Sequence, residues 1–138
     1  MSELFKKLNL KAEGAILVLD APASFEEELA ALAGVQVHRT LEGAGPVGFA
    51  LAFVQKQADL EARSRALVAQ AEGDAILWFA YPKKSSKRYH CDFNRDSGWA
   101  ALRGAGYESV RMVAIDEDWS ALRFRKVAYI KTLTRAAR

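Results

Sequence analysis

Residues 74–95 read DAILWFAYPKKSSKRYHCDFNR, a hydrophobic run followed by a strongly basic one. Positions 75–81 are all apolar or aromatic, and the run ends at Pro82. About seven such residues closed by a proline are typical of a strand buried on both faces, as at the centre of a parallel sheet. The basic stretch 83–88 then follows at the carboxyl end of this strand. In open α/β sheets that edge is where ligands usually bind.

Length and composition indicate one domain. The chain has 138 residues, 51% of them hydrophobic and 27% charged, and a chain of this size buries roughly 68% of its unfolded surface. No run approaches the ~20 apolar residues of a membrane span, and the first residues lack the apolar centre of a signal peptide. The single Cys91 excludes an internal disulfide, which agrees with a reducing compartment. We therefore expect one soluble, cytoplasmic domain over residues 1–138, with no membrane partner. The sequence does not indicate the oligomeric state.

The charge is divided unevenly along the chain. Residues 1–82 carry 7 basic and 11 acidic side chains, whereas residues 83–138 carry 13 and 6. A basic half is compatible with a nucleic acid or another polyanion as partner, but many small domains are mildly basic without one. The charge distribution therefore bears on which partners the chain binds and does not indicate its fold.

Hydrophobic patterning predicts strands that alternate with helices. Continuous apolar runs or alternating segments predict six strands, at residues 15–19, 35–39, 47–54, 75–81, 107–115 and 119–127. Amphipathic spacing with start and stop signals predicts four helices, at residues 2–8, from 24 to Gly34, 57–71 and 99–103.

The links between these elements carry further expectations. Ser24-Phe25-Glu26-Glu27 has the form of a capping box, in which the serine hydroxyl caps the helix that follows. Residues 40–46 are too few for a helix, although parallel strands normally need a crossover of a dozen or more residues. We expect the second strand to be very short and parallel, with an extended linker; the alternative is that it is not parallel. The tight link 116–118 makes the last two strands an antiparallel hairpin.

The order of these elements resembles the class I methyltransferase-like Rossmann fold. The resemblance rests on a helix followed by Glu72-Gly73-Asp74, the strand that ends at Pro82, and the segment 99–113. It implies a three-layer α/β fold with a sheet of about six strands, mostly parallel with an antiparallel C-terminal hairpin. Four segments also resemble a group of small bacterial proteins of unknown function: LDAP at 19–22, AYPK at 80–83, DFNRD at 92–96 and WSALRF at 119–124.

The first loop departs from the pattern that the resemblance implies. Class I methyltransferases place a glycine-rich turn after the first strand, where backbone N–H groups approach S-adenosylmethionine. Here no glycine lies between Gly14 and Gly34, and Pro22 has no N–H. The side chains of the turn from Asp20 to Ser24 would crowd such a ligand. We therefore expect no cofactor bound in the usual manner.

Catalytic and metal-binding patterns are weak. The two histidines and one cysteine show no partner at a motif spacing. Neighbours in the run His90-Cys91-Asp92 point to opposite sides of an extended chain and cannot all hold one ion. The acids at 116–118 are typical of a solvated turn, and Cys91 stands near cations that lower a thiol pKa. We expect no catalytic residue and no metal ligand among them.

The loop that contains the basic stretch 83–88, which we call the basic loop, is the candidate site. It is either a solvated, mobile loop that aids solubility or a surface that binds an anion or a partner. The second hypothesis assigns anion or partner binding to eight residues, of which the last two lie on the neighbouring hairpin: Lys83, Lys84, Lys87, Arg88, Asn94, Arg95, Trp119 and Arg123.

These patterns favour a non-catalytic binding or interaction module, with an anion-binding basic loop, over an enzyme. One alternative is an atypical S-adenosylmethionine-dependent methyltransferase-like enzyme that holds its cofactor in an unusual pose. Another is a nucleic-acid-binding protein. The partner is accordingly an anionic small molecule or a nucleic acid, and the sequence does not name it.

Overall fold

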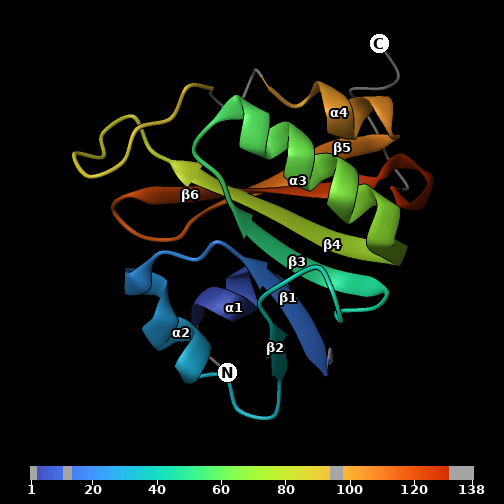
Figure 1. Cartoon of the computed structure of the whole chain (residues 1–138), viewed down its shortest axis with the longest axis horizontal. Coiled ribbons are helices and arrows are strands. Elements are labelled where there is room, and N and C mark those ends of the chain that lie inside the picture. Colours follow the sequence, from blue (N-terminus) through green and yellow to red (C-terminus); the bar gives the residue numbers. More distant parts are fainter. Residues whose placement is uncertain (1–2, 11–13, 94–97, 131–138) are drawn as a thin grey trace.

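The computed structural model describes residues 3–10, 14–93 and 98–130. Its centre is a six-stranded sheet with the strand order β2-β1-β3-β4-β6-β5 (Figure 1). The strands are β1 (Ala15–Leu19), β2 (Gln36–His38), β3 (Val47–Phe53), β4 (Ala71–Pro82), β5 (Tyr107–Ala114) and β6 (Trp119–Lys126).

The sheet is mostly parallel, as predicted. The β1–β2, β1–β3 and β3–β4 pairs are parallel, and the β4–β6 and β5–β6 pairs are antiparallel. β2 has only three residues and pairs in parallel with β1. The prediction of a short parallel second strand is therefore confirmed, because a strand this short leaves residues 39–46 to cross the sheet without a helix.

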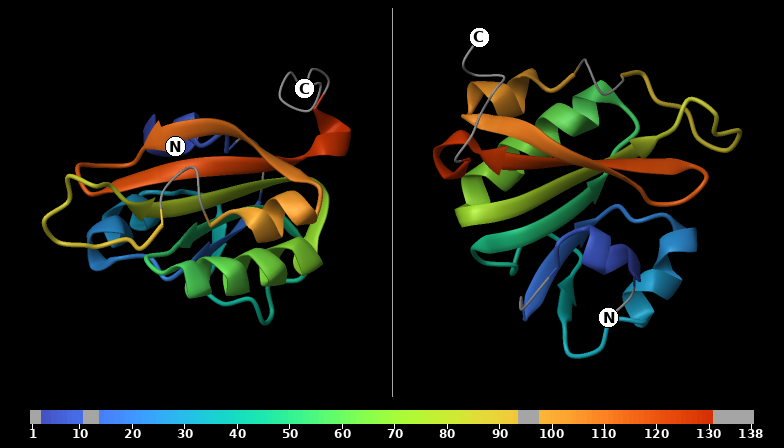
Figure 2. Two further views of the ribbon diagram at one scale, coloured as in Figure 1. Left: turned by 90° about the horizontal axis from the view of Figure 1, so that it is seen from above. Right: turned by 180° about the vertical axis from the view of Figure 1, so that it is seen from behind.

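Helices cover both faces of the sheet and complete three layers (Figure 2). On one face lie α3 (Gln57–Gln70) and α4 (Ala100–Gly104), whose Leu60 and Leu102 join one buried cluster. On the other lie α1 (Glu3–Lys7) and α2 (Glu26–Ala30), whose Phe5 and Leu29 join a second cluster. The predicted α/β architecture with helices on both faces is confirmed.

β4 separates the two clusters and has a buried residue on each face. Leu77 and Phe79 point into the α3–α4 cluster, while Trp78 points into the α1–α2 cluster. All three are fully buried. The prediction that 75–81 is a central strand buried on both faces is confirmed, and the strand extends four residues further towards the N-terminus than predicted.

The capping-box prediction at Ser24 is wrong. Ser24 lies inside a short 3-10 helix (Ala23–Phe25), and α2 begins at Glu26 without a capping side chain. The Phe25 N–H donates to the Pro22 carbonyl at 2.9 Å, and the Phe25 ring is buried. Since the turn at Pro22 and the buried ring fix the entry to the helix, the serine is not needed as a cap. α2 also ends at Ala30, earlier than the predicted stop at Gly34.

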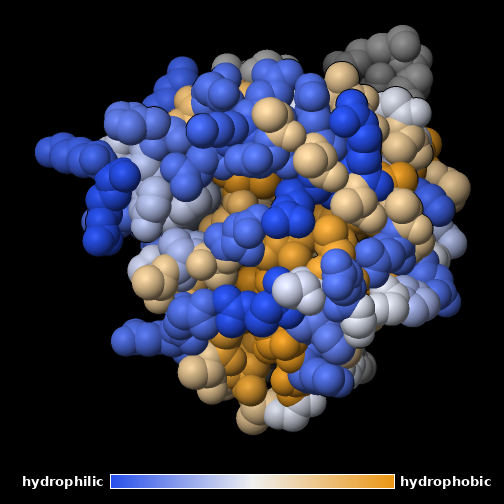
Figure 3. Space-filling model, viewed as in Figure 1, coloured by the Kyte–Doolittle hydropathy of each residue, from blue (hydrophilic) through white to orange (hydrophobic). Residues whose placement is uncertain are grey.

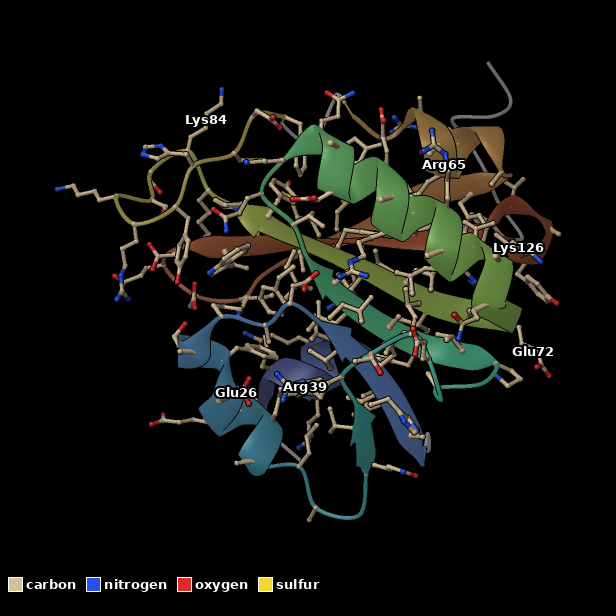
Figure 4. All side chains as sticks on the ribbon, viewed as in Figure 1. Glu26, Arg39, Arg65, Glu72, Lys84 and Lys126 are labelled. Carbon is tan, nitrogen blue, oxygen red and sulfur yellow. The ribbon has the colours of Figure 1, made fainter. Side chains whose placement is uncertain are left out.

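The first glutamate of α2, Glu26, has a structural role. Glu26 forms a two-oxygen ion pair with Arg39, which follows β2, and the two side chains point toward one another in Figure 4. This pair lowers the pKa of Glu26 below its ordinary value through the hydrogen bonds from Arg39.

No helix in the described part of the chain is long and apolar enough to cross a bilayer.

Candidate functional site

The loop after β4 projects from the end of the sheet and is held by Ser86 (Figure 2). The Ser86 hydroxyl donates to Oδ1 of Asp118 at 2.9 Å and accepts the N–H groups of Arg88 and Tyr89 at 3.2 and 3.1 Å. Ser86 is only 8% exposed. These bonds fix the backbone of the loop, so its described part does not have the structure of an unanchored, solvated loop.

The acidic turn between β5 and β6 anchors this loop. The Lys83 N–H donates to the Asp118 carbonyl at 2.8 Å, continuing the β4–β6 pairing in which Pro82 lies opposite Trp119. Oδ1 of Asp116 accepts the N–H groups of Asp118 and Trp119 at 2.8 and 2.9 Å. The Asp116 carboxylate therefore holds the backbone of this turn, and the Asp118 carboxylate holds the Ser86 hydroxyl. The start of β6 lies beside the exit of β4, as expected.

Ser86→Ala tests this anchor. We expect tryptic cleavage within the loop to become about tenfold faster, because losing about 1.4 kcal/mol of local stability raises the population of the open loop by that factor. The measurement is limited proteolysis followed by mass spectrometry. Ser85→Ala is the matched control, since Ser85 is exposed and adjacent. Equal cleavage rates in the two variants would show that the Ser86 bonds do not hold the loop.

The predicted site residues do not all meet. Lys84, Lys87 and Arg88 are exposed, and Lys84 stands at the outer rim of the loop (Figure 4). The space-filling view shows hydrophilic side chains projecting from the same end of the molecule (Figure 3). Lys83 is half-buried and Trp119 is buried. Asn94 and Arg95 lie outside the described residues.

Arg123 lies apart from the loop. It is opposite Trp78, in the middle of the sheet, and its Nη1 donates to Oδ1 of Asn9 at 3.2 Å. Burial, together with the charges of Arg125 and Arg111, lowers the pKa of Arg123. The expected grouping of Arg123 with the basic loop is not formed, because Arg123 is four residues along β6 from Trp119.

Two cavities lie at the carboxyl edge of the sheet. We call the first the edge cavity; its volume is about 470 Å³, and its lining residues are Asp20, Pro22, Phe53, Gln55, Asp59, Ala62, Arg63, Tyr89 and Trp119. We call the second the loop cavity; its volume is about 630 Å³, and its lining residues are Tyr81, Pro82, Lys83, Lys84, Tyr89, His90, Cys91, Asp92, Phe93, Met112 and Ser120.

The edge cavity sits above the ends of β1 and β3. Asp20 follows β1 directly, and Gln55 follows the end of β3 by two residues. The chain leaves β1 toward β2 on one side and β3 toward β4 on the other, so this is the point where the direction of winding reverses. Ligands of open α/β sheets bind at such a point. The side chains of the first loop were expected to crowd it, but they leave a cavity.

Asp20 explains how the loop turns without glycine. Its φ is +58°, the left-handed region that aspartate tolerates better than most residues. Its Oδ2 accepts Nε and Nη2 of Arg63 at 3.1 and 2.8 Å. The ion pair joins the first loop to α3 across the cavity, and the local turn gives the strained conformation that is often found at functional sites.

Aromatic rings form another wall of the edge cavity. Trp119 lies 4.9 Å from Tyr89 and 5.1 Å from Phe53 between ring centroids. Its Nε1 is buried and has no hydrogen-bond partner within the described part of the chain. A buried indole N–H without a partner is costly, and Trp119 bears this cost beside the edge cavity.

The two cavities are neighbours. Tyr89 lines both. Near it, the Asp92 N–H donates to the Gln55 carbonyl at 3.3 Å, and Oδ1 of Asp92 accepts the Gln57 N–H at the start of α3 at 2.6 Å. The loop therefore packs against the β3–α3 connection and forms the boundary between the cavities.

Cys91 does not behave as its charged neighbours suggested. Burial raises the pKa of the Cys91 thiol, and the charge of Asp92 adds to this. The thiol donates to the Phe93 carbonyl at 3.0 Å. Within the described residues, no three His, Cys, Asp or Glu side chains are placed to hold a metal ion.

Sequence reasoning missed the α3 side of the edge cavity. Asp59, Ala62 and Arg63 lie about one turn apart on α3 and so share a face. The helical spacing was visible in the sequence, but the pairing of Arg63 with Asp20 spans 43 residues and leaves no local signal.

Solved structures show which fold this is. A SAM-dependent methyltransferase from Aquifex aeolicus aligns with a TM-score of 0.62 and 16% identity, over 91% of this chain and 88% of its own. Magnesium protoporphyrin IX methyltransferase from Synechocystis PCC 6803, with bound SAH, aligns at 0.58 and 10% identity, over 89% and 78%. The cyclase SpnF aligns at 0.53 and 11% identity, over 89% and 78%.

The sequence itself gives no comparable match. No protein-family model matches it, and no curated protein does. At identities this low the structural likeness shows the fold: the chain has a methyltransferase-like Rossmann fold, as the order of its elements predicted.

Proposed function

We propose that this chain is an atypical S-adenosylmethionine-dependent methyltransferase-like enzyme that binds its cofactor in the edge cavity. The observation that carries the proposal is the open cavity at the reversal point between β1 and β3. Its volume lies within the roughly 300–1,000 Å³ usual for small-molecule sites. The proposal departs from the sequence-based preference for a non-catalytic module without a cofactor.

The donor and acceptor set of the edge cavity fits a nucleoside that carries a positive charge. The half-buried Tyr89 offers a ring for a base, and stacking on an aromatic residue is worth about 1–3 kcal/mol per base in nucleic-acid sites. Asp20 is paired with Arg63, whereas Asp59 supplies a carboxylate for hydroxyl groups or for a cation and Gln55 supplies an amide. When bound, S-adenosylmethionine supplies a methyl group on a positively charged sulfur.

Side chains take the place of the usual glycine-rich backbone cradle. Pro22 offers no N–H, and its carbonyl already accepts the Phe25 N–H. The backbone of the first loop is therefore turned onto itself. The polar groups that reach the cavity come from Asp20 on this loop and from Asp59 and Arg63 on α3. This arrangement makes the mode of binding atypical.

The basic-loop hypotheses receive less support. Of the exposed cations, Lys87 and Arg88 line neither cavity, and the structural neighbours named above include two methyltransferases. Neither the geometry nor the likeness favours an interaction module or a nucleic-acid-binding protein over a ligand in the edge cavity.

Calorimetric titration with S-adenosylmethionine and with S-adenosylhomocysteine tests the proposal. We expect a Kd in the micromolar range for the unaltered chain. Ala62→Trp places an indole at an exposed α3 position that lines the edge cavity, and it should weaken binding at least about tenfold, or by about 1.4 kcal/mol.

Ala69→Trp is the matched control, because Ala69 is also exposed on α3, seven residues further on and outside the cavity lining. It should bind like the unaltered chain. Absence of binding to the unaltered chain, or equal weakening by the two tryptophans, would contradict the proposal.

A further inference from the structure

The loop cavity is a second candidate site, because the proposed cofactor occupies only the edge cavity. It is built by four segments: the end of β4, the basic loop, β5 through Met112 and β6 through Ser120. Its volume of about 630 Å³ suits a small molecule with one or two rings. It shares Tyr89 with the edge cavity, so the two sites are adjacent without being one.

The inner wall of the loop cavity is apolar. The rings of Tyr81 and Phe93 lie 5.8 Å apart at an angle of 48°, and both residues are buried. The Tyr81 hydroxyl lies 3.6 Å from Sδ of Met112. Met112 is 48% exposed and lines the cavity, so its polarizable thioether can contact an aromatic ligand beside the two rings.

The mouth of the loop cavity is positively charged. Lys83 and Lys84 line it, and His90 lies further along the same wall. The acid in the lining, Asp92, accepts the Gln57 N–H at 2.6 Å at the N-terminus of α3, where a carboxylate is favoured by the helix dipole. Two lysines against this one carboxylate leave the lining with a net positive charge, which favours an anion.

We propose that the loop cavity binds a small aromatic acid: a flat apolar body held against Tyr81, Phe93 and Met112, with a carboxylate or phosphate group at Lys83 and Lys84. In the proposed enzyme this molecule is the substrate. Its role as substrate rests on the proposed function, whereas its binding does not.

Titration with 2-naphthoate, its neutral amide and 2-naphthyl phosphate tests the charge requirement. We expect the carboxylate to bind at least about tenfold more tightly than the amide, since a charge-assisted bond at the lysines is worth about 1.4 kcal/mol or more. The phosphate arm shows which anion the lysines prefer. Inorganic phosphate alone should bind much more weakly, because it makes no contact with the rings.

Variants locate the site. Lys83→Gln with Lys84→Gln should weaken 2-naphthoate about tenfold and leave the affinity for S-adenosylhomocysteine unchanged. Lys87→Gln is the matched control, because Lys87 is exposed on the same loop and does not line the cavity. Met112→Trp should obstruct the site, and Val110→Trp, at another exposed position of β5, should not.

Three results would overturn the inference. The first two are equal affinity for naphthoate and its amide, and no binding of either. The third is equal weakening by Lys87→Gln, because binding would then follow the general charge of the loop. Naphthoate binding without S-adenosylhomocysteine binding would refute only the proposed function. The reverse pattern would refute only this inference.

Discussion

Trp99→Ala is expected to destabilise the fold by about 3–5 kcal/mol, the usual cost of removing a buried aromatic side chain. Trp99 is 1% exposed and lies just before α4. Its ring contacts four others: it stacks on Phe124 at 5.1 Å and meets Phe93, Tyr81 and Phe79 at 5.6, 5.8 and 6.0 Å. A cavity at this position would remove a ring contact from each of the four.

Urea unfolding followed by circular dichroism measures this loss. Trp99→Phe should cost less, since a smaller ring keeps part of the contacts. Two rings of the cluster, Tyr81 and Phe93, also form the wall of the loop cavity, so the alanine variant should lose 2-naphthoate binding too. A loss of stability below about 1 kcal/mol would contradict the central place of Trp99 in this layer.

Trp78→Ala is expected to cost as much on the other face of the sheet, again about 3–5 kcal/mol. Trp78 is fully buried, and its Nε1 donates to the Leu8 carbonyl at 2.8 Å. This bond ties the segment after α1 to the central strand, across 70 residues of sequence. The alanine variant loses both the packing and the bond, and leaves a carbonyl without its donor.

Trp78→Phe separates the two contributions. It keeps an aromatic ring and removes the N–H, so its loss in the free energy of unfolding should be close to the cost of one unsatisfied buried group, about 1–3 kcal/mol. Hydrogen exchange of residues 3–10 should rise in both variants. If Trp78→Ala unfolds like the unaltered chain, the Leu8 bond and the α1–α2 cluster do not stabilise the fold as described.

The sheet could be predicted from the sequence because its strands have clear local patterns. The apolar run 75–81 requires burial on both faces, and the three-residue link 116–118 allows only an antiparallel hairpin. The short link 40–46 indicated a very short second strand, which the structure confirms in β2. These are local constraints, and local constraints can be read from a single chain.

The helix starts and the site depended on contacts that the sequence does not show. Ser24 has the spacing of a cap, but the turn at Pro22 and the buried Phe25 ring set where α2 begins. The side chains of Arg63 and Asp20 are hydrogen-bonded although they are 43 residues apart in the sequence, and those of Ser86 and Asp118 although they are 32 apart. Side-chain partners at such separations follow from the strand order, which no local pattern contains.

The prediction of the site was partial for the same reason. The role of Lys83, Lys84 and Trp119 in binding stays a prediction, but all three line cavities at the predicted edge of the sheet. Arg123 does not, because it lies four residues from Trp119 along an extended strand, about 13 Å away at the usual rise per residue. The first loop without glycine predicted that its side chains would crowd a cofactor, whereas Asp20 adopts the left-handed turn itself and the loop borders a cavity.

Amide chemical-shift mapping with S-adenosylhomocysteine tests the central claim, that the edge cavity is the cofactor site, most directly. The account predicts the largest shifts at Asp20, Gln55, Arg63 and Tyr89, which line that cavity, with small shifts at Lys87 and Arg88. Shifts confined to the basic loop, or none at millimolar ligand, would contradict it.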